Sequence, residues 1–371
     1  MEIQKYFSQK KELYNSLSFL IETDELDETT FKDLDQVVKN QEIIDKKEEL
    51  THFLRLISSF CNNRCKTPRF YDKIKKILLY YQDQIKHSFT NSEIFHIFED
   101  NKLIILILLE NKIIQINSDL LNIILHKNEL NGTKYAHFFI PEIRDFYNSE
   151  NNKENLNDIL NIDCNQLPQD YDAKRQIGEN DSFICTLIRT DSVVEFISYI
   201  NKKCISTSSK INHSIFETNS FLNENDPTLI EYAAYFGSIQ IFNYLRMSEA
   251  ELTPTLLLYG IHSNNADLIH LLEGINFEFT EEINEKCLIE SIKCHHNDIS
   301  NYIINEKMNS NLDENKNICA SAFNYYNYDF IPQDLTKSFV FFYLNDLNYS
   351  EMVNVFLEMK KNEINQFIIF Q

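Results

Sequence analysis

Hydrophobic and polar residues follow a helical rhythm in residues 226–245, which read D-P-T-L-I-E-Y-A-A-Y-F-G-S-I-Q-I-F-N-Y-L. Two apolar faces flank Gly237: Leu229, Ile230, Ala233 and Ala234 make the first, and Ile241, Phe242, Tyr244 and Leu245 make the second. This spacing is typical of two amphipathic helices. Gly237 is expected to end the first helix, because glycine adopts a left-handed conformation without steric penalty. Thr228 is expected to cap that helix through its hydroxyl, so the stretch predicts a tight helical hairpin.

The same hairpin pattern recurs along the chain. Further copies span residues 183–200, 255–272 and 286–303, with Ser192, Asn264 and His295 at the position of Gly237. Weaker copies are residues 93–114, which place Asn101 at that position, and residues 320–331 and 350–358. The segment 201–225, rich in Ser, Thr and Asn, interrupts the series as an insertion. The recurrence predicts stacked hairpins, because a single repeat cannot bury its apolar face alone.

Residues 228–245 resemble the ankyrin repeat, whose pattern is T-P-L-H-x-A-A-x-x-G-x-x-x-h-h-x-x-L-L. The matching positions are Thr228, Ile230, Ala233, Ala234, Gly237, Ile241, Phe242 and Leu245. Leu229 replaces the usual proline and Glu231 the usual histidine, so we expect a looser start to the first helix. The predicted turns are 45, 27 and 31 residues apart, whereas the ankyrin period is about 33. The two short spacings favour connections without β-hairpins.

Four longer motifs make the resemblance more specific: I-E-Y-A-A-Y-F-G-S-I-Q-I-F, L-I-R-T-D-S-V-V-E-F-I-S-Y-I, S-I-F-E-T-N-S-F-L and S-I-K-C-H-H-N-D-I-S-N-Y-I. They are similar to the large trichomonad family of ankyrin-type domains of unknown function, over about residues 140–330. The resemblance implies an all-α fold, an ankyrin-type solenoid of helical hairpins with degenerate N-terminal helical repeats. It implies no particular chemistry, because that family has no assigned biochemical role.

The helical rhythm is lost over residues 141–157, where the sequence becomes polar, as is typical of a surface linker or a long insertion. We therefore divide the chain into an N-terminal helical region, residues 1–147, a polar linker, residues 148–180, and an ankyrin-type repeat domain, residues 181–371. The five glycines and six prolines are too few for a protein of many β-hairpins, which favours helices throughout.

Composition and charge narrow the classes of partner. The formal net charge of −21 opposes binding to nucleic acid, because neutralising phosphates requires clustered cations. We expect Lys73, Lys75 and Lys76 to lie on a solvated helix face.

The most apolar run, residues 103–109, is shorter than the roughly 20 residues of a membrane span, so it predicts a buried helix and no membrane insertion. The N-terminus lacks an apolar core of signal-peptide length, and the eight cysteines form no dense framework, which favours a cytoplasmic protein with reduced thiols.

A candidate metal site lies at residues 287–296. Cys287 and Cys294 are seven residues apart, about two helical turns, and His295 and His296 follow them. Zinc prefers Cys and His ligands in tetrahedral sets. The alternative is structural packing, with Cys287 in the helix core and His295 in the turn, where histidine tolerates a positive φ better than most residues. The packing alternative is preferred, so no metal or other cofactor is expected, and a metal-stabilised or metal-sensing domain stays the alternative function.

No catalytic motif is present: the sequence lacks G-x-S-x-G, G-x-x-x-x-G-K-S/T, H-E-x-x-H and G-x-G-x-x-G. We therefore expect a non-enzymatic scaffold that binds an unidentified protein partner through the concave face of the repeats. The expected solvent-facing contact residues are Tyr235, Phe236, His262, Ser263 and Lys293. Another possibility is an adaptor that binds one partner through its N-terminal helices and a second through the repeats.

Overall fold

The computed structural model describes residues 2–23, 28–63, 69–127, 135–149, 160, 167–275, 280–308, 315–331 and 357. Within these ranges the regular secondary structure is helical, and the one β pairing is an isolated bridge between Lys210 and Thr228. The all-α class is therefore confirmed for this part of the chain. Residues 350–356 and 358 of the last weak repeat lie outside it.

The chain divides into two compact units, and the larger one spans Ile43–Ile275. Its first elements are η1 (Ile43–Asp45), α3 (Lys47–Asn63), α4 (Phe70–Tyr80), α5 (Gln82–Ser88), α6 (Asn91–Phe98), α7 (Lys102–Glu110), α8 (Ser118–His126), η3 (Tyr135–Phe139) and α9 (Ile140–Ser149). The rest are α11 (Tyr171–Ile177), α12 (Phe183–Arg189), α13 (Val193–Lys203), α14 (Ser220–Asn225), α15 (Leu229–Phe236), α16 (Ile239–Met247), α17 (Leu256–Ser263) and α18 (Ala266–Glu273).

The second unit joins the two ends of the chain, Met1–Glu42 and Asn276–Gln371. Its described elements are α1 (Glu2–Glu22), α2 (Glu28–Asn40), α19 (Glu281–Lys293), α20 (Asn297–Lys307), α21 (Lys316–Asn324) and η5 (Tyr328–Phe330). Phe7 of α1 packs against Phe323 and Tyr328, at ring-centroid distances of 6.1 Å each. Neither unit boundary falls in the expected linker at 148–180, and α11 forms a helix inside that segment.

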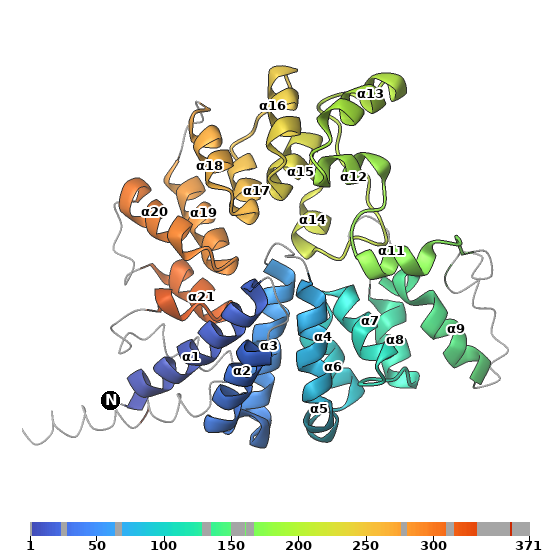
Figure 1. Ribbon diagram of the computed structural model, residues 1–371, viewed down its shortest axis with the longest axis vertical. Helices are drawn as coiled ribbons and strands as arrows, with labels where there is room; N and C mark the ends of the chain where they lie inside the picture. Colours follow the sequence, from blue (N-terminus) through green and yellow to red (C-terminus); the bar gives the residue numbers. More distant parts are fainter. Residues whose placement is uncertain are drawn as a thin grey trace, which may run out of the picture. The chain divides into compact units, whose positions relative to one another are not determined.

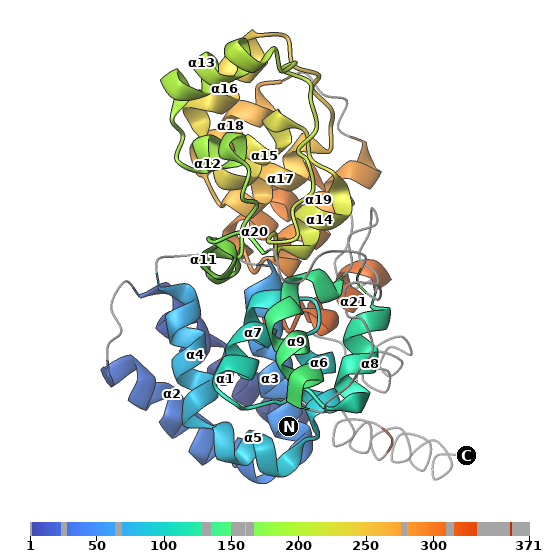
Figure 2. The ribbon, with the colours of Figure 1, turned by 90° about the vertical axis from the view of Figure 1, so that its right-hand side faces the viewer.

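Each strong copy of the repeat pattern forms a helical hairpin, as predicted. The pairs are α12 with α13, α15 with α16, α17 with α18, and α19 with α20. In the larger unit α15 packs between α12 and α17, and α13 packs against α16 (Figure 1). Figure 2, turned by 90°, looks along this row from the α12 end. Stacked helical hairpins are thus present, and the described connections between them contain no β-hairpin.

The turn residues test the predicted register. Gly237, Asn264 and His295 have φ angles of 68°, 49° and 58°, which confirms three of the predicted left-handed turns. The prediction for Ser192 is wrong by one residue, because Asp191 takes the left-handed conformation (φ 48°). The prediction for Asn101 is also wrong: its backbone is extended, and its side chain accepts a hydrogen bond from the Ile104 N–H as the cap of α7.

Four of the turns share one hydrogen-bond pattern. After the left-handed residue, the next backbone N–H donates to the carbonyl five residues earlier, as in a Schellman turn. This bond joins Ser192 to Leu187, Ser238 to Ala233, His296 to Ser291, and Asn327 to Ala322. The last pair follows Tyr326, whose φ of 59° marks a further turn of the series after α21. The repeated bond explains why hairpins of unlike sequence have the same turn.

The start of α15 is firmly fixed. The Thr228 hydroxyl accepts a hydrogen bond from the Glu231 N–H, and the Glu231 carboxylate accepts one from the Thr228 N–H, a reciprocal capping box. The cap by Thr228 is confirmed, whereas the looser start expected from Glu231 is wrong. Behind this cap, Ala233 and Leu245 are fully buried. The sequence pattern therefore identified these two core positions correctly, whereas Tyr244 of the second predicted face is only half-buried.

The turn at Gly237 predicts a graded response to substitution. An added Cβ would find its nearest neighbours at 3.5 Å, an ordinary van der Waals distance, so only the backbone conformation is restrictive. We expect Gly237→Val to lower the unfolding free energy by about 1–2 kcal/mol. Gly237→Asn should cost only a fraction of that, because asparagine tolerates a left-handed φ. Chemical denaturation measures both, and equal losses would contradict the conformational explanation.

Of two expectations about which helix residues are buried, one is confirmed and the other is wrong. Residues Leu103 to Leu108 of α7 are buried, so the apolar run forms a buried helix as predicted. In the described residues no helix combines the length and apolar character needed to cross a bilayer. The solvated face predicted for Lys73 is wrong, because its side chain is buried within α4 packing.

Candidate functional site

The insertion between the first two strong hairpins covers the end of α15. Tyr235 stacks on Phe221 of α14, with ring centroids 6.0 Å apart, and its hydroxyl accepts a hydrogen bond of 2.7 Å from the Asn219 side-chain amide. His262 lies 4.1 Å from the Phe221 ring and 4.9 Å from the Tyr235 ring. Tyr235 and His262 are both buried, so the expectation that they face solvent is wrong.

A pocket of about 290 Å³ opens beside this cluster. Four of the elements described above line it: the end of α12, the start of α14, the end of α15 and the end of α17. Its lining residues are Glu179, Arg189, Glu217, Asn219, Leu222, Tyr235, Phe236 and Ser263. Phe236 and Ser263 are half-buried. Three of the five sequence-predicted contact residues thus meet at one pocket, although one of them, Tyr235, is covered.

Glu217 and Asn219 of the pocket lining belong to a segment, residues 214–219, that hydrogen bonds fix in place. The Thr218 hydroxyl donates a 2.7 Å hydrogen bond to the carbonyl of Gly178. From α7, the Lys102 ammonium donates a 2.9 Å hydrogen bond to the carbonyl of Ile215. Ser214 bonds the Asp181 carboxylate at 2.7 Å. These bonds hold the segment from several directions, so the pocket is preorganised.

Arg189 forms one wall of the pocket and is held on several sides. Its Nε lies 2.8 Å from a Glu179 carboxylate oxygen. One Nη atom donates to the Asn180 carbonyl and to the Tyr232 hydroxyl, both at 2.9 Å, and the other donates to Thr186 at 3.3 Å. Burial disfavours the charged guanidinium, but the neighbouring Tyr232 and Glu179 outweigh it and raise the pKa of Arg189. The arginine is therefore a fixed cation that positions Glu179.

Glu217 is a buried carboxylate in the pocket lining. One oxygen accepts a 2.9 Å hydrogen bond from the Asn219 N–H, and the other accepts a 3.1 Å bond from the Asn180 N–H. Its relative exposure is 4%. A carboxylate has lone pairs for about four hydrogen bonds, so these two backbone donors leave acceptor capacity on both oxygens.

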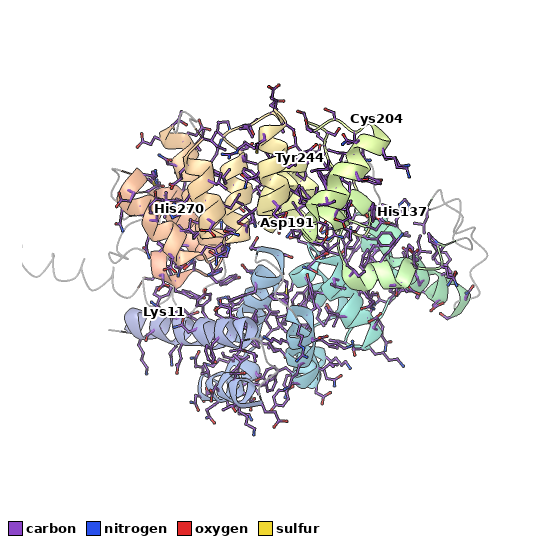
Figure 3. The ribbon with its side chains drawn as sticks, turned by 45° about the horizontal axis from the view of Figure 1, so that its top comes forward. Lys11, His137, Asp191, Cys204, Tyr244 and His270 are labelled. Carbon is purple, nitrogen blue, oxygen red and sulfur yellow. The ribbon has the colours of Figure 1, made fainter. Side chains whose placement is uncertain are left out.

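Hydrogen bonds between turns hold neighbouring hairpins in register next to the pocket. The Asp191 carboxylate accepts bonds from the Gln240 and Ile241 N–H groups, at 3.0 and 2.9 Å, and so caps the start of α16 from the preceding hairpin. The Ser238 hydroxyl donates a 2.6 Å bond back to the Ile188 carbonyl. Figure 3 labels Asp191 in its turn and Tyr244 on α16 of the next hairpin. The order of the pocket elements is thus set by polar contacts as well as by the core.

The fifth expected contact residue, Lys293, belongs to the smaller unit and does not line the pocket. Its ammonium lies 3.2 Å from a Glu290 carboxylate oxygen and 5.7 Å from the centre of the Tyr325 ring. Burial disfavours its charge, but Glu290 outweighs this effect and leaves the pKa of Lys293 raised. Its side chain is only 19% exposed, so it offers little surface to a partner.

The residues of the candidate metal site have packing roles. His295 stacks on Tyr14 at a ring distance of 4.8 Å, and its Nε2 lies 2.7 Å from the Tyr325 carbonyl oxygen. Burial, with a contribution from Glu290, raises the pKa of the Cys287 thiol to about 12, which disfavours the thiolate that zinc binds. In the part of the chain that the structure describes, the ligand atoms of these four residues do not gather within 4.8 Å of one another. These contacts favour structural packing.

The charged residues of the pocket were not anticipated from the sequence. Glu217 and Asn219 belong to the motif S-I-F-E-T-N-S-F-L, in which four polar residues stand between two phenylalanines. Buried polar side chains are unusual unless they are hydrogen-bonded, so a polar run between aromatic anchors is the signal that could have marked them. Comparison with known protein families, curated proteins and solved structures gave no match to this chain.

Proposed function

We propose that the chain is a non-enzymatic scaffold that binds a protein partner through an ankyrin-type array of helical hairpins. The pocket of about 290 Å³ is the observation that carries the proposal. Segments from consecutive hairpins and from the insertion meet there, and they combine fixed charges with a half-buried aromatic side chain. Aromatic residues are favoured at protein interfaces, because they bury a large area at small entropic cost.

Two features of the array support an ankyrin-type arrangement. The left-handed turn residues Gly237 and Asn264 are 27 positions apart, and His295 follows 31 positions later. The two spacings are similar, as expected of a chain built from repeats. The same Schellman bond closes several of these turns. The net charge of −21 favours partners with basic surfaces, since opposite charges accelerate encounter.

Peptide selection on the intact protein tests the proposal. Peptides selected from a random display library should bind the parent protein and lose at least about tenfold in affinity to Phe236→Ala, because hot-spot aromatics carry more than about 1.4 kcal/mol of binding free energy. Tyr244→Ala is the matched control, since this half-buried aromatic lies on α16 outside the pocket. Equal affinity for the parent, Phe236→Ala and Tyr244→Ala would overturn the pocket as the binding site, as would failure to select any peptide.

A further inference from the structure

We propose that the pocket receives a basic side chain, lysine or arginine, from the partner protein. This inference rests on the proposed scaffold function and specifies the group that the scaffold recognises. The lining contains two carboxylates, Glu179 and Glu217, and one guanidinium, Arg189. It therefore carries a formal net charge of −1, in a pocket whose lining side chains are buried or half-buried.

The hydrogen-bonding groups of the pocket are complementary to a donor. Arg189 forms one wall of the pocket. Its Nε and Nη atoms already pair with protein oxygens 2.8–3.3 Å away. The Asn219 side chain is likewise committed: its amide nitrogen donates to Tyr235, and its oxygen accepts from the Leu222 N–H. Glu217 retains acceptor capacity on both oxygens. A guest that donates hydrogen bonds and carries positive charge satisfies these groups, whereas an anionic guest meets repulsion.

The remaining lining fits the rest of a basic side chain. Tyr235 and Phe236 present rings whose centroids are 4.9 Å apart at an interplanar angle of 67°. Aromatic faces attract ammonium and guanidinium groups. Leu222 adds apolar surface for the methylene stem, which lysine and arginine bury while their charged heads seek polar partners. The volume of about 290 Å³ is near the lower limit of ligand pockets, which suits one side chain better than a larger molecule.

Buried charge gives a reason for the partner to bind. A buried carboxylate without a cation near it is costly, and adding the cation recovers part of that cost. Glu179 already has Arg189 as its cation, at 2.8 Å. The hydrogen bonds to Glu217 described above come from the backbone N–H groups of Asn180 and Asn219, which carry partial charges only. An incoming ammonium or guanidinium group would supply the full positive charge.

Small amide probes test the chemistry on the intact protein. Nα-acetyl-lysine methylamide, Nα-acetyl-arginine methylamide and the neutral Nα-acetyl-norleucine methylamide are titrated while the Leu222 methyl signals are followed by NMR. One or both basic probes should shift these signals with a dissociation constant on the order of millimolar. Norleucine should bind at least about tenfold more weakly, because it lacks the charge-assisted hydrogen bonds. Equal responses to norleucine and to the basic probes would overturn the inference.

Charge-neutralising variants provide the second arm. Glu217→Gln and Glu179→Gln should each weaken basic-probe binding by about tenfold. Glu195→Gln, an exposed position on α13, is the matched control and should bind like the parent. If Glu217→Gln fails to fold, Glu179→Gln still decides the question. Unchanged binding by the folded variants would contradict the inference.

The display-selected peptides separate failure of this inference from failure of the proposed function. Replacing each basic residue of a selected peptide by norleucine should remove most of its affinity for the parent protein. Peptides whose affinity depends on Phe236 but is unchanged by these replacements would refute the inference of a basic side chain and leave the proposed scaffold function intact. Peptides whose affinity does not depend on Phe236 would refute the proposal that the pocket is the binding site.

Discussion

Replacing Ala233 with aspartate is expected to abolish stable packing of the α15 hairpin. Ala233 is fully buried in the last turns of α15, where α15 packs against neighbouring helices. The new carboxylate would be buried without a cation, and it would also lie near the negative end of the helix dipole. We expect a loss of about 4 kcal/mol or more in unfolding free energy, or a protein that does not fold.

The same chemical change at Ala266 is the control. This alanine is exposed in the first turn of α18, where a negative charge is favourable. Ala266→Asp should therefore leave the unfolding free energy unchanged or slightly raised. Burial raises the pKa of the new carboxyl at position 233, so the folded state binds more protons and the loss in Ala233→Asp should shrink as the pH falls. Hydrogen exchange in α15 measures the effect, and parent-like protection in Ala233→Asp would contradict the packing described here.

Arg175→Ala is expected to have the second largest effect. Arg175 of α11 is buried, and its guanidinium holds both carboxylate oxygens of Glu142 on α9, at 3.0 and 2.7 Å. It also donates to the Phe138 carbonyl and to Asp172. Burial disfavours the charge, but Glu142 outweighs it and raises the pKa of Arg175. Removing the arginine leaves Glu142 without its cation, so we expect the unfolding free energy to fall by about 3 kcal/mol. This is the low end of the range for a broken buried ion pair, because Glu142 is partly exposed.

Lys174→Ala is the comparison for that experiment. Lys174 neighbours Arg175 on α11, but its side chain is 27% exposed, and it pairs with Asp170 and Asp181 at 3.1 and 3.0 Å. A partly exposed pair of this kind contributes at most about 1 kcal/mol. Chemical denaturation of both variants measures and compares their losses of unfolding free energy. A loss in Lys174→Ala as large as in Arg175→Ala would show that burial does not distinguish the two ion pairs.

Local patterns were sufficient to predict the helical hairpins. The helix cap at Thr228 and the left-handed turn at Gly237 depend on residues within one hairpin, and both are confirmed. The turns at Asn264 and His295 followed from the same spacing. These features are predictable because side-chain capping and backbone conformation are decided over a few neighbouring residues.

Errors of register arose where two polar residues compete for one turn. In the sequence T-D-S, Asp191 takes the left-handed conformation and Ser192 does not. A short acidic side chain tolerates that conformation, and here it also caps α16 of the next hairpin, a contact outside the local pattern. Asn101 shows the reverse case, because asparagine is equally suited to an N-cap and it caps α7.

Exposure could not be predicted at the ends of the inner helices. Spacing alone places Tyr235 and His262 at solvent-facing positions, yet Phe221 of the insertion packs on both rings. The insertion has no repeat counterpart, so its path is decided by non-local hydrogen bonds such as Lys102 to Ile215. The polar lining residues of the pocket were unpredictable for the same reason, because Glu217 becomes a lining residue only when residues 214–219 are folded against α11 and α15.

Photo-crosslinking from the pocket tests partner binding most directly. Ser263 lines the pocket, and Asn243 on α16 is a half-buried position outside it. The photoreactive residue p-benzoylphenylalanine would be placed at each position in turn, and a display-selected peptide would be added before irradiation. We expect a crosslink from position 263 that maps next to a basic residue of the peptide, and none from position 243. A crosslink from position 243 with none from position 263 would contradict the proposal that this pocket binds the partner.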